Sequence, residues 1–282
     1  MSERIDYNSN IHDRIAPLYE SRHEEIFNPT EQRRISDQLT FAMGSIACCS
    51  GAPRVLDFGA GTGNLTRHLL KLGSAVVACD VSAGCLRELE ASSDGTACLE
   101  LSLLNGRDLS QFADASFDMV AVYSVLHHVP DYLAIIDEFV RVVKPGGVIY
   151  IDHEVCPAYW EERPQYRDYC QALDRRRQAE RVGFWQHLAG ISRRKHWWRY
   201  LASALWVRLN RVEDEGDIHT HPDDHIEWEQ ILARMEGGCR ILRQQDYLVC
   251  RERAVPAVVW DAWRHRCADM RLTVAQRCRE QV

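Results

Sequence analysis

The sequence predicts an α/β protein built on a parallel sheet that is flanked by helices. Between residues 54 and 154, short apolar runs of strand length alternate with segments whose apolar side chains recur at helical spacing. The first run, 54–58, is followed directly by glycines at positions 59, 61 and 63, which permit a tight turn from a strand into a helix. Strand, glycine turn and helix in this order are typical of α/β proteins that hold a ligand at the carboxyl ends of their strands.

The apolar runs and the residues between them indicate the order of strands and helices in this region. We expect strands at 54–58, 75–79, 97–103, 117–123 and 148–151. A helix from about Asn64 to Leu72 follows the first strand, and Ser82 and Asp131 are suited to cap the two helices that come next. Residues 144–147, Lys-Pro-Gly-Gly, predict the turn into the fifth strand.

The chain divides into four regions. We expect a helical layer over 1–50, the α/β core over 51–155, a helical insertion rich in Arg, Trp, Tyr and His over 156–224, and a C-terminal part over 225–282. In the last part, Asp224 is expected to cap a helix from His225 to about Met235. A two-stranded hairpin over 239–252, turning at 244–246, and a final helix over 259–280 are expected to follow.

Composition excludes several classes of protein. The 282 residues are 46% hydrophobic and 27% charged, as in ordinary globular proteins, and no stretch approaches the roughly 20 consecutive apolar residues that cross a bilayer. The amino-terminal segment lacks the apolar run of a secretion signal, and the eleven cysteines contain no C-x-x-C pair, so we expect a cytoplasmic protein with reduced thiols. A net charge of −7 argues against general nucleic-acid binding.

The glycine pattern separates two kinds of nucleotide-like ligand. A dinucleotide fingerprint, G-x-G-x-x-G, would need its third glycine at position 64, where the chain has Asn64. The sequence at 57–63 is Asp-Phe-Gly-Ala-Gly-Thr-Gly, and the acidic Asp80 follows the second strand. This stretch resembles motif I of the class I S-adenosylmethionine-dependent methyltransferases. Segments 125–131, Val-Leu-His-His-Val-Pro-Asp, and 141–147, Arg-Val-Val-Lys-Pro-Gly-Gly, resemble later motifs of the same family, of the type 11 or ubiquinone-biosynthesis-methyltransferase kind.

The resemblance implies a Rossmann-like, seven-stranded, mostly parallel sheet with an antiparallel last strand. It also implies that the chain binds S-adenosylmethionine and methylates a small-molecule acceptor by direct in-line transfer, with 1–50 as a lid, 51–155 as the cofactor-binding core and 156–224 covering the acceptor. The implied cofactor-binding residues are Asp57, Gly59, Ala60, Gly61, Gly63, Asp80, Val81, Asn105, Gly106, Ser124 and Tyr19. Asp80 can accept hydrogen bonds from both ribose hydroxyls, whereas Asn105 stands where the family usually has an acid and would make a weaker, neutral bond to adenine.

Two adjacent histidines are the candidates for chemistry. His127 and His128 follow the fourth strand, at the edge where α/β sheets bind ligands, and an imidazole can take a proton at neutral pH. A base is needed only if the acceptor begins protonated. One histidine could therefore be a catalytic base, with His128 slightly favoured. The alternative is that both rings only pack in the loop and shape the pocket. Asp152, His153 and Glu154 end the fifth strand at the same rim, as a polar strand end or as an acceptor contact.

Two further segments leave alternatives open. His219, His221 and His225 could ligate a divalent metal together with the acids between them, but Pro-Asp-Asp before His225 favours a helix start, so no metal-binding residue is assigned. Segment 193–210 mixes basic and aromatic residues and predicts a helix over the acceptor, with a lipid-linked acceptor at a membrane surface or RNA stacking as alternatives. A non-catalytic regulatory protein that binds S-adenosylmethionine, the acceptor atom and the oligomeric state also stay open.

Overall fold

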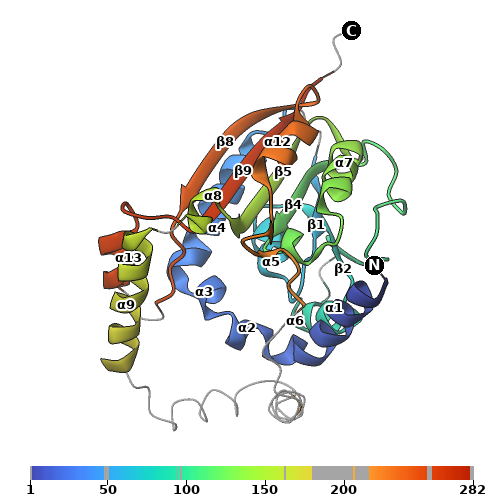
Figure 1. The fold of residues 1–282 in the computed structure, drawn as a ribbon. Coiled ribbons are helices and arrows are strands. Elements are labelled where there is room, and N and C mark those ends of the chain that lie inside the picture. Colours follow the sequence, from blue (N-terminus) through green and yellow to red (C-terminus); the bar gives the residue numbers. More distant parts are fainter. Residues whose placement is uncertain are drawn as a thin grey trace.

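A seven-stranded sheet with helices on both faces organises the protein (Figure 1). The computed structural model describes residues 2–47, 51–93, 95, 97–161, 163–179, 206, 216–252 and 256–279. The strands of the sheet are β1 (Arg54–Phe58), β2 (Ala75–Asp80), β3 (Leu99–Leu103), β4 (Phe117–Tyr123), β5 (Val143–Val155), β8 (Cys239–Tyr247) and β9 (Met270–Arg277).

The strand order is β3-β2-β1-β4-β5-β9-β8. Strands β1 to β5 pair in parallel, whereas β9 runs antiparallel to both of its neighbours, β5 and β8. The predicted mostly parallel sheet of seven strands, with the last strand of the chain antiparallel, is therefore confirmed. The strand order reverses between β1 and β4, and this reversal leaves a crevice at the carboxyl ends of the central strands.

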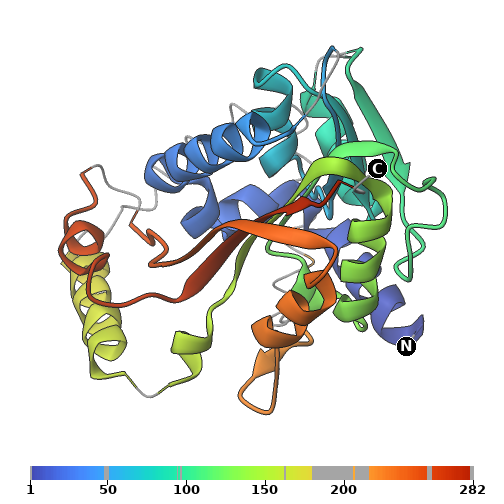
Figure 2. The same ribbon diagram turned by 90° about the horizontal axis from the view of Figure 1, so that it is seen from above.

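Helices of different parts of the chain cover the two faces of the sheet and lie at one end of it (Figures 1 and 2). They are α1 (Ser2–Ile15), η1 (Ala16–Leu18), α2 (Tyr19–Arg22), α3 (Glu24–Phe27), α4 (Pro29–Gly44), α5 (Asn64–Lys71), α6 (Ala83–Ser92), η2 (Leu126–His128), α7 (Tyr132–Val142), α8 (Pro157–Trp160), α9 (Pro164–Ala179), α12 (Trp228–Met235) and α13 (Val258–Trp263). Val55 packs with α4 and α5, whereas Leu56 packs with α7 and α12. This alternation arises because successive side chains of a strand point to opposite faces. Helices α9 and α13 pack on each other at one end of the sheet.

The helix starts show which capping predictions hold. Ser82 accepts from the backbone N–H of Cys85 (3.0 Å) and Asp131 from that of Ala134 (3.0 Å), so both predicted caps are confirmed. Helix α5 begins after Gly63 without a side-chain cap of its own. Asp57, buried at the end of β1, accepts a hydrogen bond of 2.5 Å from the Thr66 hydroxyl and a second bond from the Thr66 backbone, and so takes the place of that cap.

The C-terminal part differs from the prediction. Residues 239–247 form one strand, not a two-stranded hairpin, because 244–246 continue the ladder opposite 271–273. The predicted final helix over 259–280 is also wrong, since α13 ends at Trp263 and β9 follows it. The four consecutive residues 272–275 in the middle of β9 are all buried, as in a strand that is covered on both faces.

Two boundaries nearer the core also need correction. Helix α12 begins at Trp228 after Glu227, so Asp224 does not cap it; Asp224 pairs instead in a small ladder between β6 (Thr220–His221) and β7 (Asp224–His225). Strand β5 begins at Val143, earlier than predicted, because residues 144–147 form an irregularity within the strand.

A cluster of buried polar side chains joins α4 to the sheet. Arg34 donates from Nη2 to Oδ2 of Asp152 in β5 (2.9 Å) and from Nε to Oε1 of Glu31 in its own helix (2.8 Å). Three hydroxyl groups also donate to these two carboxylates, those of Tyr123, Tyr150 and Tyr247. Burial lowers the pKa of Arg34, but Asp152 and Glu31 raise it well above its ordinary value, so the guanidinium stays charged.

Loss of the Arg34 charge should destabilise the fold. In Arg34→Ala the buried Glu31 and Asp152 carboxylates lose their counter-charge, and we expect the free energy of unfolding to fall by about 3–5 kcal/mol, as measured by urea denaturation. Arg33→Ala, an exposed neighbour on α4, is the control and should change it by less than about 0.5 kcal/mol. Equal effects of the two substitutions would show that the cluster adds nothing beyond an ordinary surface contact.

The Asp57 carboxyl should make stability depend on pH. Burial raises its pKa from 3.8 to about 7, although the hydrogen bonds from Thr66 lower it. Because the folded protein holds this proton more tightly than the unfolded chain, the associated stability is present below pH 3.8 and is lost as the pH rises through about 7. In Asp57→Asn the amide oxygen can still accept from Thr66, and we expect this decline to disappear from urea unfolding curves recorded between pH 4 and pH 8. The same pH profile in both proteins would contradict the assignment.

Candidate functional site

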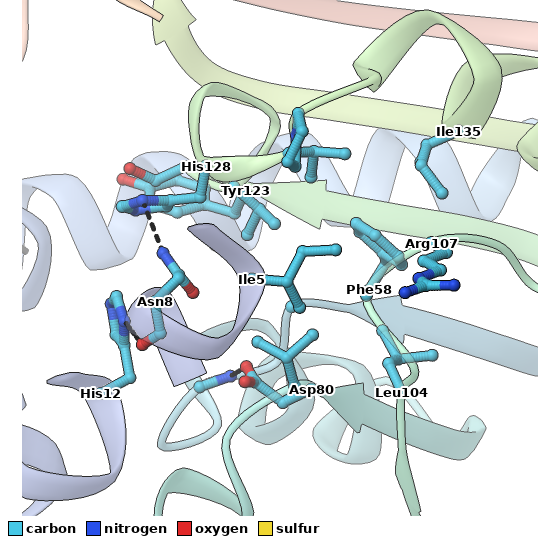
Figure 3. Close-up of a pocket in the computed structure, with 18 of the residues that line it drawn as sticks. Ile5, Asn8, His12, Phe58, Asp80, Leu104, Arg107, Tyr123, His128 and Ile135 are labelled. Atoms are coloured by element: carbon cyan, nitrogen blue, oxygen red, sulfur yellow. Dashed lines mark hydrogen bonds between the residues drawn. The ribbon is translucent and has the colours of Figure 1, made fainter. Parts of the chain in front are cut away.

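A cavity lies at the carboxyl ends of β1, β2 and β4, between these strands and α1 (Figure 3). Figure 3 shows His12, His128 and Asn8 gathered at one end, and Phe58, Leu104 and Ile135 at the other. Of the residues singled out from the sequence, those that line the cavity are Tyr19, Gly59, Gly61, Asp80, Val81, Gly106, Ser124 and His128. Those that do not line it are Asp57, Ala60, Gly63, Asn105 and His127.

The glycines after β1 serve two different purposes. Gly61 lines the cavity at φ +53°, and a Cβ on it would meet no protein atom within 4 Å, so the loop leaves this space to a ligand. Gly63 has φ +95°, and a Cβ there would lie 2.4 Å from Cδ1 of Leu89. Gly63 is therefore needed for the packing of α5 against α6, whereas Gly61 allows a close approach of the loop to the ligand.

Asp80 holds the glycine loop to the start of the next helix. Its Oδ2 accepts from the backbone N–H of Gly61 (2.8 Å), and its Oδ1 accepts from that of Ser82 (2.8 Å). Burial raises the pKa of Asp80, and these two bonds lower it. Each carboxylate oxygen keeps a second lone pair, so Asp80 can accept from a pair of ligand hydroxyls while the loop stays in place.

Helix α1 closes the cavity through contacts that sequence reasoning missed. Asp13 accepts through Oδ1 from the hydroxyl of Ser82 (2.7 Å) and from the backbone N–H of Gly84 (2.6 Å), at the start of α6. Ile5 packs where a Cβ on Gly106 would come within 2.5 Å of its Cγ2. In the sequence, only Gly84 and Gly106 are related to these contacts. The reason for a glycine at each position becomes clear once α1 is placed, because Asp13 and Ile5 lie against them.

The side chain of Asn105 turns away from the cavity because it closes a turn. Its Oδ1 accepts from the backbone N–H groups of Arg107 (2.7 Å) and Asp108 (3.1 Å), and its Nδ2 donates to Oδ1 of Asp108 (2.9 Å). Gly106, Arg107 and Asp108 line the cavity instead. The Asn105 side chain, implied by the sequence as an adenine contact, is therefore engaged in a turn outside the cavity lining.

Glu154 fixes η2 and orients His127. Its Oε1 accepts from the backbone N–H groups of Val125 (2.8 Å) and Leu126 (2.7 Å), and its Oε2 accepts from Nδ1 of His127 (2.8 Å). Burial lowers the pKa of His127, but the Glu154 carboxylate raises it by more than burial lowers it. The net shift of the pKa is therefore upward. The sequence left Glu154 as a polar strand end or an acceptor contact, and the structure uses it to anchor the loop after β4.

His128 stands in a different environment. The side-chain amide of Asn8 donates to its Nδ1 (3.2 Å), and the ring of His12 meets its ring edge-on at 5.3 Å between centroids (Figure 3). Burial lowers the pKa of His128 well below its ordinary value, and His127 and His12 lower it further. The imidazole is therefore neutral at pH 7, with a lone pair on Nδ1.

Two residues at the rim adopt the left-handed backbone conformation that favours glycine. They are Ser124, at φ 58°, after β4, and His153, at φ 64°, in β5. The ring of His153 stacks on Tyr123, and its Nδ1 lies 3.2 Å from Oγ of Ser124. Each such conformation costs on the order of 1–3 kcal/mol and is often found at functional sites. The resemblance implied Ser124 as a cofactor contact, but no feature of the sequence predicts the positive φ of Ser124.

Tyr19 contributes an aromatic ring to the same end of the cavity. Its centroid lies 4.3 Å from that of His23, 6.2 Å from that of His12 and 6.3 Å from that of Phe27. The structure thus brings Tyr19 together with His128 and Tyr123 around one space.

In the described part of the chain, the ligand atoms of the histidines at 219–225 are not gathered into one group. His219 pairs through Nδ1 with Oδ1 of Asp224 (2.5 Å), His225 lies 3.6 Å from Glu227, and His221 is exposed. Segment 193–210 lies outside the described residues except for Trp206, whose ring centroid is 5.8 Å from the Arg14 guanidinium. Among the helices that the structure describes, none is both long and apolar enough to cross a membrane.

Comparison with known sequences identifies the domain that carries the cavity. Residues 56–151 match the family described as a methyltransferase domain. A ubiquinone biosynthesis O-methyltransferase of Paracidovorax citrulli is 33% identical over 99 residues, 34% of this chain and 42% of that protein. The enzyme of the same name from Xanthomonas oryzae pv. oryzae is 36% identical over 103 residues, 35% and 41% of the two chains. This chain therefore covers less than half the length of these relatives.

Solved structures resemble nearly the whole chain. A methyltransferase of Haloferax volcanii, in complex with the Trm112 methyltransferase activator, has a TM-score of 0.56 and 18% identity and covers 95% of this chain and 97% of its own. An S-adenosylmethionine-dependent methyltransferase of Mesorhizobium loti has a TM-score of 0.52 and 18% identity over 84% and 96% of the chains. The [4+2]-cyclase SpnF has a TM-score of 0.56 and 14% identity over 96% and 95%. These likenesses show the fold, and within it residues 56–151 match a methyltransferase domain.

Proposed function

We propose that this protein transfers the methyl group of S-adenosylmethionine directly to a small-molecule acceptor. The observation that carries the proposal is that Gly61, Asp80 and His128 line one cavity. The two ends of the cavity suit two different ligands. The loop at Gly61 and the Asp80 carboxylate can hold the ribose of the donor, whereas the end lined by Tyr19 and His128 can hold an acceptor.

The donor end fits the parts of S-adenosylmethionine. Asp80 has free lone pairs for the ribose hydroxyls, and Gly61 leaves open space beside them. Phe58, Leu104 and Val81 provide apolar surface for the adenine ring. These assignments agree with the order of the motifs along the sequence.

The acceptor end is suited to a group that loses a proton on methylation. Methyl transfer is an in-line displacement at a carbon that the sulfonium already activates, so positioning supplies much of the rate. His128 reaches this end as a neutral imidazole that can take the proton of a hydroxyl group. The matched relatives are named O-methyltransferases, which favours oxygen as the acceptor atom.

The activity can be tested without knowing the acceptor. Purified chain with S-adenosylmethionine and a pool of small hydroxylated metabolites should form S-adenosylhomocysteine, measured by mass spectrometry. Cofactor binding by calorimetry without turnover on any pool would favour a regulatory protein. SpnF, a [4+2]-cyclase, shows why this test matters, because the fold alone does not select methyl transfer.

Replacement of Asp80 should weaken cofactor binding. In Asp80→Asn the ribose hydroxyls lose a charged acceptor worth about 1.5–3 kcal/mol, so the Kd for S-adenosylmethionine should rise about ten- to a hundredfold by calorimetry. Glu90→Gln, an exposed acid in α6, is the matched control and should leave the Kd unchanged. An unchanged Kd in a folded Asp80→Asn protein would remove Asp80 from the cofactor site.

Replacement of His128 should act on turnover. If His128 is the base, His128→Ala should lower kcat by about 10²–10⁴ and leave the cofactor Kd nearly unchanged, whereas His265→Ala, an exposed histidine, should alter neither. Because the pKa of His128 lies well below 6.5, kcat of the wild-type protein should fall with acidification only below that pH. Retained turnover in His128→Ala would show that the ring only shapes the cavity.

A further inference from the structure

We propose that His127, His128 and Asp217 form a binding site for a divalent metal ion of the zinc class. Each residue offers one ligand atom, and these atoms all lie within 4.8 Å of one another. Two imidazole nitrogens and one carboxylate oxygen are a donor set that Zn²⁺ commonly takes, with further positions left open. No sequence pattern indicates this set, because Asp217 is distant in the chain from the two histidines.

The distances between the donor atoms suit one small ion. Oδ1 of Asp217 lies 3.3 Å from Nδ1 of His128 and 3.8 Å from Nε2 of His127. Two ligands of a tetrahedral ion at about 2.0–2.1 Å are themselves separated by about 3.3 Å. The His128–Asp217 pair already has this separation, and the half-exposed side chain of Asp217 can close the gap to His127. The two imidazole nitrogens, which lie within 4.8 Å of each other, would draw together on binding.

Glu154 supplies the support that a metal-bound histidine requires. Its carboxylate is buried and fixed by two backbone N–H groups, and it accepts from Nδ1 of His127. This bond leaves Nε2 of His127 on the side of Asp217. A carboxylate behind the imidazole fixes the tautomer and the ring orientation, as is usual for metal-ligating histidines.

A fourth donor lies nearby. The side-chain amide of Asn8 is 3.2 Å from Nδ1 of His128, and its oxygen and nitrogen can exchange places by rotation of the amide. With the oxygen turned toward the ion, Asn8 would add a neutral ligand to the set. Because His128 and Asn8 both line the cavity, the ion would lie at its wall.

This inference goes beyond methyl transfer, since metal binding needs neither cofactor nor acceptor. An ion on Nδ1 of His128 would also occupy the lone pair assigned above to proton transfer. In the loaded protein the ion itself would lower the pKa of a coordinated hydroxyl group and so replace the imidazole in that step.

Calorimetric titration with Zn²⁺ tests the site on the full chain after chelator treatment and dialysis. We expect one ion per chain, and an affinity at least about tenfold lower in Asp217→Ala and in His127→Gln. Asp223→Ala, an exposed acid of the neighbouring segment, is the matched control and should bind as the wild-type protein does. Thermal melts establish that each variant is folded. Because the Asp217 side chain is exposed, Asp217→Ala removes a ligand without disturbing the packing of the protein interior.

Binding elsewhere must be separated from this site, because the chain has eleven cysteines and twelve histidines. Co²⁺ substitution should give visible d–d bands without the intense near-ultraviolet band of thiolate ligands, and these bands should be lost in Asp217→Ala. No saturable Zn²⁺ binding, equal affinity in Asp217→Ala and the wild type, or a thiolate spectrum would each overturn the proposal. These outcomes do not depend on methyl transfer, so they are distinguishable from a failure of the proposed function.

Discussion

Arg34 reaches from α4 into the sheet and pairs with Asp152 at the carboxyl end of β5, and the geometry of the cavity depends on this contact. A carboxylate as deeply buried as that of Asp152 is costly unless a counter-charge and hydrogen bonds satisfy it, so the pair ties α4 to one place on the sheet. Helix α1 and the shorter helices α2 and α3 precede α4 along the chain, and α1 lines the cavity at the carboxyl ends of the strands. Their placement over the cavity is therefore linked to an ion pair outside it.

The end of β5 also shows how neighbouring residues come to serve different elements. A regular strand would direct Asp152 and Glu154 to the same face. The positive φ of His153 and the shift in pairing between Ile151 and Glu154 interrupt that alternation. Asp152 can then meet Arg34, while Glu154 reaches the backbone of η2. The backbone strain is local, and the buried hydrogen bonds on both sides offset its cost.

Local patterns predicted the parts of the fold whose partners lie close in sequence. Strands β1, β2 and β4, the caps Ser82 and Asp131, and the acidic Asp80 beside the glycine loop could all be placed in this way. The hairpin and final helix failed because β8 and β9 pair across the intervening α13, a contact that no local pattern records. Asp13 shows the same limit in the site, since it accepts from the start of a helix 71 residues further along the chain.

The contrast between His127 and His128 illustrates how surroundings, not residue type, set the chemistry available at this site. Both rings are partly buried, and burial lowers the pKa of each. His127 faces the Glu154 carboxylate, which more than offsets that effect, whereas His128 faces other imidazoles, which add to it. The ring that lines the cavity is thus the one that is neutral at pH 7, and its Nδ1 lone pair, which accepts from Asn8, is the one that a proton or a metal ion would take. The other ring is held by a buried carboxylate that fixes its orientation, and this division of roles follows from where β5 places Glu154.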